Sequence, residues 1–288
     1  MKNILILGSS GFLGSKLTSG EYLKKYKIIT HSQKSETDIN LNLQEDTKVI
    51  KMMKQTKPHL IINLVGLTNV DHCEKYPNEA YRLNVKTIEN IVKAIKETFV
   101  KPYLIHISTD QVYDNLGNSP EKNINLLNYY AYSKYLGELF ARQTSSTILR
   151  TNFFGKSKNL SRGLTDWLYN QLISYNKINV FEDVWFNPIS LSYLCEMIEL
   201  SVEKKIVGTF NLGSNKGMSK ADFAFKFANA LNFPTTNMKR IKVANYKFLN
   251  ARRPNNMIMD LTKFEKNFYI KLPLMKEEIK LTAKEYLK

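Results

Sequence analysis

The sequence predicts an α/β fold, in which a Rossmann-type, doubly wound parallel sheet precedes a smaller, mostly helical C-terminal domain. Over about the first 155 residues, short apolar runs rich in β-branched residues alternate with stretches of helical spacing. This alternation implies right-handed crossovers and a parallel sheet covered by helices on both faces. Further along the chain helical patterns predominate, which indicates a second domain.

We expect the first domain, which contains this alternation of strands and helices, to cover residues 1–155 and to bind a nucleotide. Its strand-like runs lie at Asn3–Leu7, Lys27–Thr30, Leu60–Leu64, Tyr103–Ile107 and Thr147–Leu149. Its helical stretches lie at Leu13–Leu17, Val49–Met53, Ala80–Ile95 and Tyr135–Ala141.

The second domain is expected over residues 156–288 and binds the substrate. Helical spacing returns at Leu164–Ile173, Leu191–Val202, Lys220–Leu231 and Met275–Tyr286, with strand-like pieces at Ile178–Phe181 and Thr209–Leu212. We expect segments around 180–215 to return and extend the first sheet. The connection Tyr113–Asn128 has little periodicity and is longer than ordinary loops, which is typical of a loop beside a functional site.

Composition excludes several classes of protein. A chain of 288 residues with 43% apolar residues can bury a sizeable core, which excludes a disordered or low-complexity chain. Cys73 and Cys195 lie far apart, and neither they nor the four His residues cluster at metal-ligand spacing, so we expect no metal and a reducing, cytoplasmic compartment. The longest apolar stretch, Leu60–Leu67, is far shorter than the ~20 residues that span a bilayer.

The net charge of +16 raises the alternative of a nucleic-acid partner. Nucleic-acid-binding proteins usually group Arg and Lys on one stripe. Here 35 of the 42 basic residues are lysines, and they are spread along the whole chain. We therefore expect neither a nucleic-acid nor a membrane partner.

A glycine-rich turn follows the first predicted strand directly, with the sequence Gly8-Ser9-Ser10-Gly11-Phe12-Leu13-Gly14. In a strand–turn–helix setting such glycines permit a tight turn, close approach of a pyrophosphate and close helix packing. The turn therefore predicts dinucleotide binding, with a ligand-free glycine turn as the alternative.

The end of the second predicted strand bears on the choice between NADP and NAD. There an acidic residue would bind the 2′-hydroxyl of NAD and repel a 2′-phosphate. The segment Thr30-His31-Ser32-Gln33-Lys34 contains no acid, and its polar groups favour NADPH, with NADH as the alternative. We take His31 and Ser32 as cofactor-binding candidates, although an ordinary polar loop would have similar composition.

Three residues form a candidate catalytic group. Thr109 ends the fourth strand-like run, and Tyr130 precedes Lys134 by one helical turn. A phenol acts as an acid near neutrality when positive charge stabilises the phenolate. Lys134 would lower the Tyr130 pKa and hold the nicotinamide ribose, Tyr130 would protonate a substrate carbonyl, and Thr109 would orient it. The alternative is a half-buried tyrosine beside a flexible lysine.

These motifs, together with Gly137-Glu138 and Leu149-Arg150-Thr151, resemble the extended short-chain dehydrogenase/reductase family. The chain is most similar to its dTDP-4-dehydrorhamnose reductase branch, through further stretches at 63–74, 80–85 and 253–260. The resemblance implies a Rossmann domain and NAD(P)H-dependent reduction of a nucleotide-activated 4-keto-6-deoxysugar. That activity belongs to deoxysugar and polysaccharide biosynthesis.

The resemblance also assigns individual residues. Its cofactor contacts fall on Gly8, Gly11, Phe12, Leu13, Gly14, Asn42, Leu43, Leu64, Val65, Gly66, Thr68, Tyr130 and Lys134. Its substrate positions fall on Val70, Thr109, Asp110 and Gln111, and we add Asn152. Arg252 and Arg253 are our candidates for the diphosphate, because a forked guanidinium suits phosphate oxygens, with a surface charge as the alternative for either.

Gln111 helps to separate neighbouring activities. The 4,6-dehydratases of the family carry a carboxylate at this position to remove a proton, and an amide cannot act as that base. Neither cysteine falls where the epimerase-reductases place theirs, so Cys73 is expected to be a packed thiol. Among the activities of the family, simple reduction of the keto group therefore remains. The alternatives are a non-catalytic NAD(P)-binding regulatory subunit and another sugar-nucleotide epimerase or reductase, and a homodimer is left open as the assembly.

Overall fold

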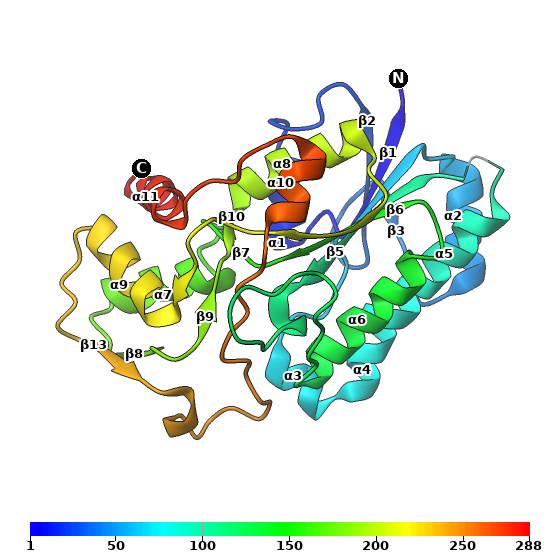
Figure 1. Ribbon diagram of the computed structural model, residues 1–288. Coiled ribbons are helices and arrows are strands. Elements are labelled where there is room, and N and C mark those ends of the chain that lie inside the picture. The colour runs from blue at the N-terminus through cyan, green and yellow to red at the C-terminus, as the bar shows by residue number, and fades with distance from the viewer. Residues whose placement is uncertain (100) are drawn as a thin grey trace. The chain divides into compact units, whose positions relative to one another are not determined.

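The computed structural model describes residues 1–99 and 101–288 of the chain (Figure 1). A seven-stranded sheet has the strand order β11-β6-β5-β4-β1-β2-β3. Its strands are β1 (Asn3–Leu7), β2 (Lys27–Ser32), β3 (Ile39–Asn40), β4 (Leu60–Asn63), β5 (Tyr103–Thr109), β6 (Ser146–Thr151) and β11 (Gly208–Leu212). The pairings of β1 with β2 and β4, of β2 with β3 and of β4 with β5 are parallel, as predicted.

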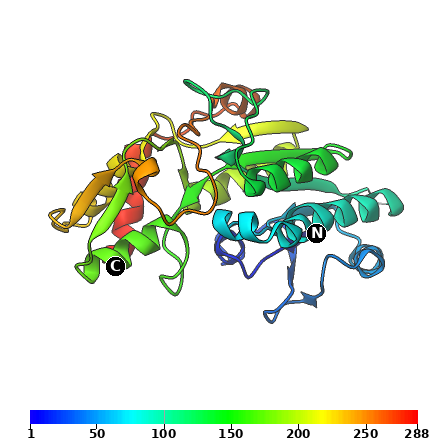
Figure 2. The same ribbon diagram turned by 90° about the horizontal axis from the view of Figure 1, so that it is seen from below.

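Helices cover both faces of this sheet. They are α1 (Phe12–Leu17), α2 (Asp46–Thr56), α3 (Val70–Lys75), α4 (Pro77–Tyr81), the π-helix η1 (Arg82–Lys86), α5 (Thr87–Glu97), α6 (Tyr129–Ala141) and α8 (Leu191–Lys204). Helices α2, α5 and α6 pack in a row on one face, and α5 and α6 run side by side in both views (Figures 1 and 2). Helices α1 and α8 cover the other face, where Lys25 forms an ion pair of 3.1 Å with Glu203.

The apolar core beneath α2 and α5 accounts for the apolar runs from which the strands were predicted. Strand residues such as Leu5, Ile61 and Leu104 are completely buried, because both faces of the sheet are covered. Helix α5 adds a stripe that includes Ile91 and Ile95. A strand buried on both faces is apolar throughout, so it stands out in the sequence.

The chain divides into two compact units. Unit 1 comprises Met1–Thr109, Asn128–Arg150 and Cys195–Phe210, and unit 2 comprises Asp110–Leu127, Thr151–Leu194 and Asn211–Lys288. This division assigns residues 110–127 and 151–155 to unit 2, and the segment that returns to unit 1, residues 195–210, lies within the expected range. Contacts within unit 2 hold the segment after β5, where Tyr113 Oη donates to Asn211 Oδ1 at 2.7 Å.

Unit 2 combines helices with very short strands. The helices are η2 (Asp110–Val112), α7 (Gly163–Ile173), α9 (Lys220–Ala230), η3 (Val243–Asn245), α10 (Thr262–Phe268) and α11 (Met275–Leu287). The strands are β7 (Phe153–Phe154), β8 (Ile178–Phe181), β9 (Trp185–Phe186), β10 (Ile189–Ser190), β12 (Met218–Ser219) and β13 (Met238–Ile241). They pair as β7 with β10, β9 with β12 and β8 with β13, around an aromatic core that includes Phe154, Phe223 and Phe227.

The expected return of a segment around 180–215 to the first sheet is confirmed, because β11 pairs with β6 at its edge. The segment Ile178–Phe181 forms the predicted strand β8, which pairs with β13 in a separate two-stranded sheet. Its residues alternate between buried and more exposed, which suits a small one-sided sheet. The helical stretch Ala80–Ile95 is interrupted by the π-helix η1, whose longer turn does not appear in a 3.6-residue pattern.

The loop Tyr113–Asn128 forms no helix or extended strand, and a single bridge joins Ser119 to Met259. Among the described residues, no helix is long and apolar enough to cross a membrane.

Candidate active site

The glycine turn joins β1 to α1 in unit 1. Gly8 has φ +84°, and a Cβ there would lie 3.1 Å from Val65 Cγ2, so this position requires glycine. A Cβ at Gly14 would lie 2.4 Å from the Gly8 carbonyl oxygen, because α1 packs directly against the turn. The backbone N–H groups of Gly8 and Ser9 both donate to the His31 carbonyl at 3.0 Å, which fixes the turn to the end of β2.

A pocket of about 300 Å³ opens beside this turn. Nine predicted cofactor residues line it: Gly8, Gly11, His31, Ser32, Asn42, Leu43, Leu64, Val65 and Gly66. Seven further residues complete the lining: Ser10, Gln33, Lys34, Ser35, Leu41, Leu83 and Thr87. Six other predicted cofactor residues do not line it: Phe12, Leu13, Gly14, Thr68, Tyr130 and Lys134.

The polar end of β2 shapes one side of the pocket. The hydroxyls of Ser10 and Ser32 share a hydrogen bond of 2.9 Å, which links the glycine turn to this strand. His31 is buried, its Nε2 bonds the Leu41 carbonyl at 3.0 Å, and burial lowers the pKa of its imidazole. His31 is therefore neutral near pH 7, and Lys34 is the cation among the described lining residues, which include no carboxylate.

Tyr130 and Lys134 lie one turn apart on α6. The N-cap Asn128 accepts a hydrogen bond of 2.9 Å from the Ala131 N–H, so the helix begins just before Tyr130. The Lys134 ammonium donates to the Ile107 carbonyl at 2.7 Å, two residues before Thr109 at the end of β5. All three residues therefore belong to unit 1, two on α6 and one on β5, against which this helix packs.

Lys134 also lies beside the pocket. A Cβ at Gly66, which lines the pocket, would be 3.5 Å from Lys134 Nζ. Burial lowers the pKa of Lys134 to about 8, and the carboxylate of Glu138 acts in the opposite direction. The ammonium therefore remains charged at neutral pH, yet it is held in surroundings where its field is strong.

Tyr130 is 7% exposed and belongs to an apolar cluster with Cys73 and Ala80. Val70, predicted to contact the substrate, packs against the same cluster. Cys73 is completely buried, and burial raises the pKa of its thiol to about 11, so it is a packed thiol as predicted.

A buried ionic network lies one turn beyond Lys134. Glu138 and Arg150 are completely buried and form a two-pronged ion pair, with Nε–Oε1 2.8 Å and Nη2–Oε2 2.6 Å. Ser108 Oγ donates to Glu138 Oε1 at 2.6 Å, and the partly exposed Arg142 donates to Oε2 at 3.0 Å. Glu138 and Arg150 stand in motifs of the family resemblance, but their spacing in the sequence does not indicate this connection between α6 and the end of β5.

Asn84 on η1 was also missed as a site residue. Its Oδ1 accepts the Leu67 N–H at 2.8 Å, and its Nδ2 donates to Ser133 Oγ at 2.9 Å, which ties the loop after β4 to α6. A Cβ at Gly137 would lie 2.6 Å from the Asn84 carbonyl oxygen, so glycine there allows α6 to approach η1. In the sequence, only the glycine at position 137 indicates that another segment approaches α6 closely.

Unit 2 contains its own group of predicted substrate residues. Asn152 Nδ2 donates to Asp110 Oδ2 at 2.9 Å, and Asp110 is buried. Lys220, which the sequence analysis did not single out, lies near both Asp110 and Arg253: burial lowers the pKa of its ammonium, Asp110 raises it and Arg253 lowers it. Gln111 follows Asp110 in η2 and is 8% exposed.

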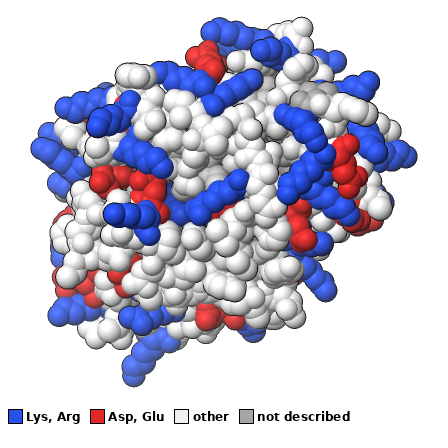
Figure 3. All heavy atoms as spheres, turned by 45° about the vertical axis from the view of Figure 1, so that its right-hand side comes forward, with Lys and Arg blue, Asp and Glu red and all other residues white. Residues whose placement is uncertain are grey.

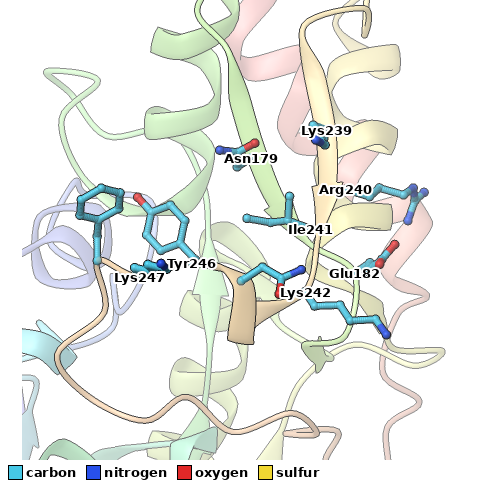
Figure 4. Close-up of a pocket in the computed structure, with 10 residues that line it drawn as sticks. Asn179, Glu182, Lys239, Arg240, Ile241, Lys242, Tyr246 and Lys247 are labelled. Atoms are coloured by element: carbon cyan, nitrogen blue, oxygen red, sulfur yellow. The ribbon is translucent and has the colours of Figure 1, made fainter.

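A separate cavity of about 820 Å³ in unit 2 lies along β8, β13 and η3 (Figure 4). Lys239, Lys242 and Lys247 line it on exposed positions, and Arg240 forms an ion pair of 2.7 Å with Asp222. None of the residues predicted from the sequence lines it, so we do not place the substrate there.

The remaining charge is dispersed. On the face drawn in Figure 3, Lys and Arg side chains form several separate groups, some of them next to Asp or Glu. Such a distribution is typical of a solvated lysine-rich surface. The described residues include no group of three or more His, Cys, Asp or Glu side chains that could hold a metal ion.

Comparison with known proteins covers the whole chain. A family model described as the RmlD substrate binding domain matches residues 1–288. The chain is 26% identical to a dTDP-4-dehydrorhamnose reductase from Shigella flexneri over 288 residues, 94% of this chain and 93% of that protein. It is 24% identical to methionine adenosyltransferase 2 subunit beta from Bos taurus over 280 residues, 92% of this chain and 82% of that protein.

Among solved structures, a dTDP-4-dehydrorhamnose reductase from Bacillus anthracis in complex with NADP matches with a TM-score of 0.90 and 25% identity. The match covers 99% of this chain and 100% of that one.

Proposed function

The chain belongs to the RmlD substrate binding domain family, and from that membership we propose that it is an NADPH-dependent reductase of a nucleotide-linked 4-keto-6-deoxysugar. The observation that carries the proposal is the position of Lys134. Its ammonium lies beside Gly66 of the nucleotide pocket and is bonded to β5 two residues before Thr109. One helical turn away on the same helix is Tyr130, the proposed proton donor.

The pocket beside the glycine turn fits a dinucleotide phosphate. Gly8 and Gly14 allow the tight turn and the direct packing of α1 against it, which is the geometry in which the backbone of such a turn binds a pyrophosphate. Lys34 and the serine hydroxyls around it suit the 2′-phosphate, and the absence of a carboxylate among the described lining residues removes the repulsion that would select NADH. We therefore propose NADPH as the preferred cofactor, with NADH as the alternative.

When bound, NADPH supplies a hydride to the substrate's carbonyl carbon. Thr109 donates a hydrogen bond to the carbonyl oxygen and fixes its position. Tyr130 transfers its proton to that oxygen as negative charge develops there. Lys134 stabilises the resulting phenolate by its charge and binds the nicotinamide ribose, while the Ile107 carbonyl and the Glu138 network hold it in place.

The nucleotide sugar is proposed to contact Val70 in unit 1 and Asp110, Gln111, Asn152 and Arg253 in unit 2. The buried Asp110 carboxylate, held by Asn152, is suited to accept hydrogen bonds from sugar hydroxyls. A cytoplasmic location and a homodimeric assembly stay predictions from the sequence.

Replacing Tyr130 by Phe tests the proposed activity. We expect kcat for NADPH oxidation with dTDP-4-keto-6-deoxysugars to fall about 100- to 10,000-fold, because the general acid is lost. NADPH affinity, measured by calorimetry, should be nearly unchanged. Tyr132 on the same helix is 46% exposed, and Tyr132→Phe is the matched control, which should turn over normally. Unchanged turnover in Tyr130→Phe would remove the proposed acid.

A second candidate is a non-catalytic NAD(P)-binding subunit. The similarity to methionine adenosyltransferase 2 subunit beta favours this alternative. It predicts NADPH binding without oxidation across dTDP-, UDP-, GDP- and CDP-linked keto-sugars. The complete Thr109, Tyr130 and Lys134 group argues for turnover, because a protein that only binds the nucleotide needs no proton donor.

A further inference from the structure

The end of strand β5 is bound to helix α6 at two consecutive residues. The Ile107 carbonyl accepts a hydrogen bond from the Lys134 ammonium at 2.7 Å. The Ser108 hydroxyl donates to Glu138 Oε1 at 2.6 Å. Lys134 and Glu138 lie one helical turn apart on α6, so the two contacts are adjacent on the helix as well. The next residue of the strand is Thr109, which the proposed reaction uses to orient the carbonyl oxygen.

Glu138 also connects the neighbouring strands β5 and β6. Its Oε1 accepts hydrogen bonds from Ser108 on β5 and, at 2.8 Å, from Arg150 Nε on β6. Its Oε2 accepts from Arg150 Nη2 at 2.6 Å and from Arg142 Nη2 at 3.0 Å. Glu138 and Arg150 are completely buried, and Ser108 is 4% exposed. Hydrogen bonds to charged groups are short and directional, so this cluster restricts movement of the two strand ends against α6.

The ladder between β5 and β4 ends before these residues. Its last pair joins Asn63 to His106, so residues 107–109 extend past the end of β4. Thr109 is also the last residue of its segment of unit 1. Beyond that pair, the contacts of Ile107 and Ser108 with α6 supply a constraint that β4 no longer provides.

We propose that Ser108 is a positioning residue for the proposed reduction. Its hydrogen bond to Glu138 sets the end of β5 against α6, so that the Thr109 hydroxyl and the Tyr130 phenol reach the same carbonyl oxygen. These two groups come from different elements, and a displacement of about 1 Å can lower a rate about a hundredfold. The role in the reaction rests on the proposed function, whereas the contacts themselves lie within unit 1. A serine that only satisfied a buried carboxylate would affect stability and not turnover.

The direct test is Ser108→Ala, which removes one donor and leaves both arginines on Glu138. We expect kcat with a dTDP-linked 4-keto-6-deoxysugar to fall about 10- to 100-fold. KM for NADPH should be unchanged, because Ser108 does not line the nucleotide pocket. The pH above which kcat/KM falls should also be unchanged, because Glu138 keeps its charge near Lys134. Unchanged kcat, or a fall that begins at lower pH, would overturn the proposal.

Ser146 provides the matched control, since it binds the other end of the same helix. Its hydroxyl donates to the Ala141 carbonyl at 2.8 Å, and it is 2% exposed. Ser146→Ala therefore also removes one buried hydrogen bond, and the two variants should show similar, small decreases in melting temperature. Ser146→Ala should turn over normally. Equal losses of kcat in the two variants would attribute the effect to helix packing in general and overturn the proposal.

Amide hydrogen exchange, followed by NMR on the protein without ligand, tests the contact independently of turnover. In Ser108→Ala, the amides of residues 107–109 should exchange about tenfold faster and those of 103–106 at the same rate, because only the strand end is released. Ser146→Ala should alter neither group. Equal exchange of residues 107–109 in Ser108→Ala and the unsubstituted protein would overturn the proposal. If exchange rises but the unsubstituted protein reduces no keto-sugar, the proposed activity fails and the positioning of the strand end by Ser108 stands.

Discussion

Lys134 in unit 1 and Lys220 in unit 2 are both lysines whose pKa is lowered by burial, but their neighbours differ. Lys134 donates to a backbone carbonyl and has the Glu138 carboxylate one turn away. Lys220 has the Phe186 ring beside it and feels the opposing charges of Asp110 and Arg253, and the described residues provide its ammonium with no hydrogen-bond acceptor. Unit 1 therefore holds the Lys134 ammonium with a hydrogen bond to the backbone, whereas unit 2 holds the Lys220 ammonium without one.

The largest effect is expected from removing the charge of Glu138, which lies one turn from Lys134. Glu138→Gln leaves Arg150 buried without its carboxylate, and we expect the free energy of unfolding to fall by about 3–5 kcal/mol in urea denaturation. Arg142→Ala, which removes the partly exposed partner of the same carboxylate, should cost less than about 1 kcal/mol. Equal losses in the two variants would contradict the view that the buried pair anchors α6.

The lowered pKa of Lys134 should make both activity and stability depend on pH. The charged lysine is the active form, so kcat/KM should be level below about pH 8 and fall about tenfold per pH unit above it. The effect on stability has the opposite sign. Between about pH 8 and the ordinary lysine pKa of about 10.4, the unfolded chain binds more protons, so the free energy of unfolding should rise, by about 3 kcal/mol in total.

The matched variant for this prediction is Lys134→Met. The stability difference between it and the unsubstituted protein, followed by denaturation from pH 7 to 10.5, isolates the contribution of this lysine. A difference that does not change with pH would show that the ammonium is not held at a lowered pKa.

The smallest effect is expected at Lys34, an exposed cation that lines the nucleotide pocket. Lys34→Ala should raise KM for NADPH about fivefold and leave KM for NADH unchanged, because an exposed charge pair contributes up to about 1 kcal/mol. Lys27, exposed at the other end of β2, provides the control: Lys27→Ala should alter neither constant. A parallel rise for both cofactors would place Lys34 away from the 2′-phosphate.

The parts of the fold that could be predicted are those with continuous apolar runs. Strands β1 and β4 and the first half of β5 are covered by helices on both faces, so most of their residues are apolar and the runs are easy to find. The two-residue strands β3, β7, β9, β10 and β12 were missed, because two residues are too few to show any period. The π-helix η1 was missed because its turn departs from 3.6 residues.

The candidate site divides in the same way. The glycine turn and the Tyr130–Lys134 pair depend on spacings of a few residues, so the sequence alone shows them. Glu138 and Arg150 are twelve positions apart, and nothing in their spacing indicates that they meet. Lys220 looked like an ordinary helix start, and only packing places it near Asp110 and Arg253.

The sequence by itself determined the alternation of strands and helices, the phosphate-binding turn and the residue types needed for proton transfer, because these follow from local spacing and side-chain chemistry. Only the tertiary structure decided which charges are buried and which of them are paired. Burial and pairing depend on segments distant in the chain, and the cost of a charge is set by the solvent and partners around it.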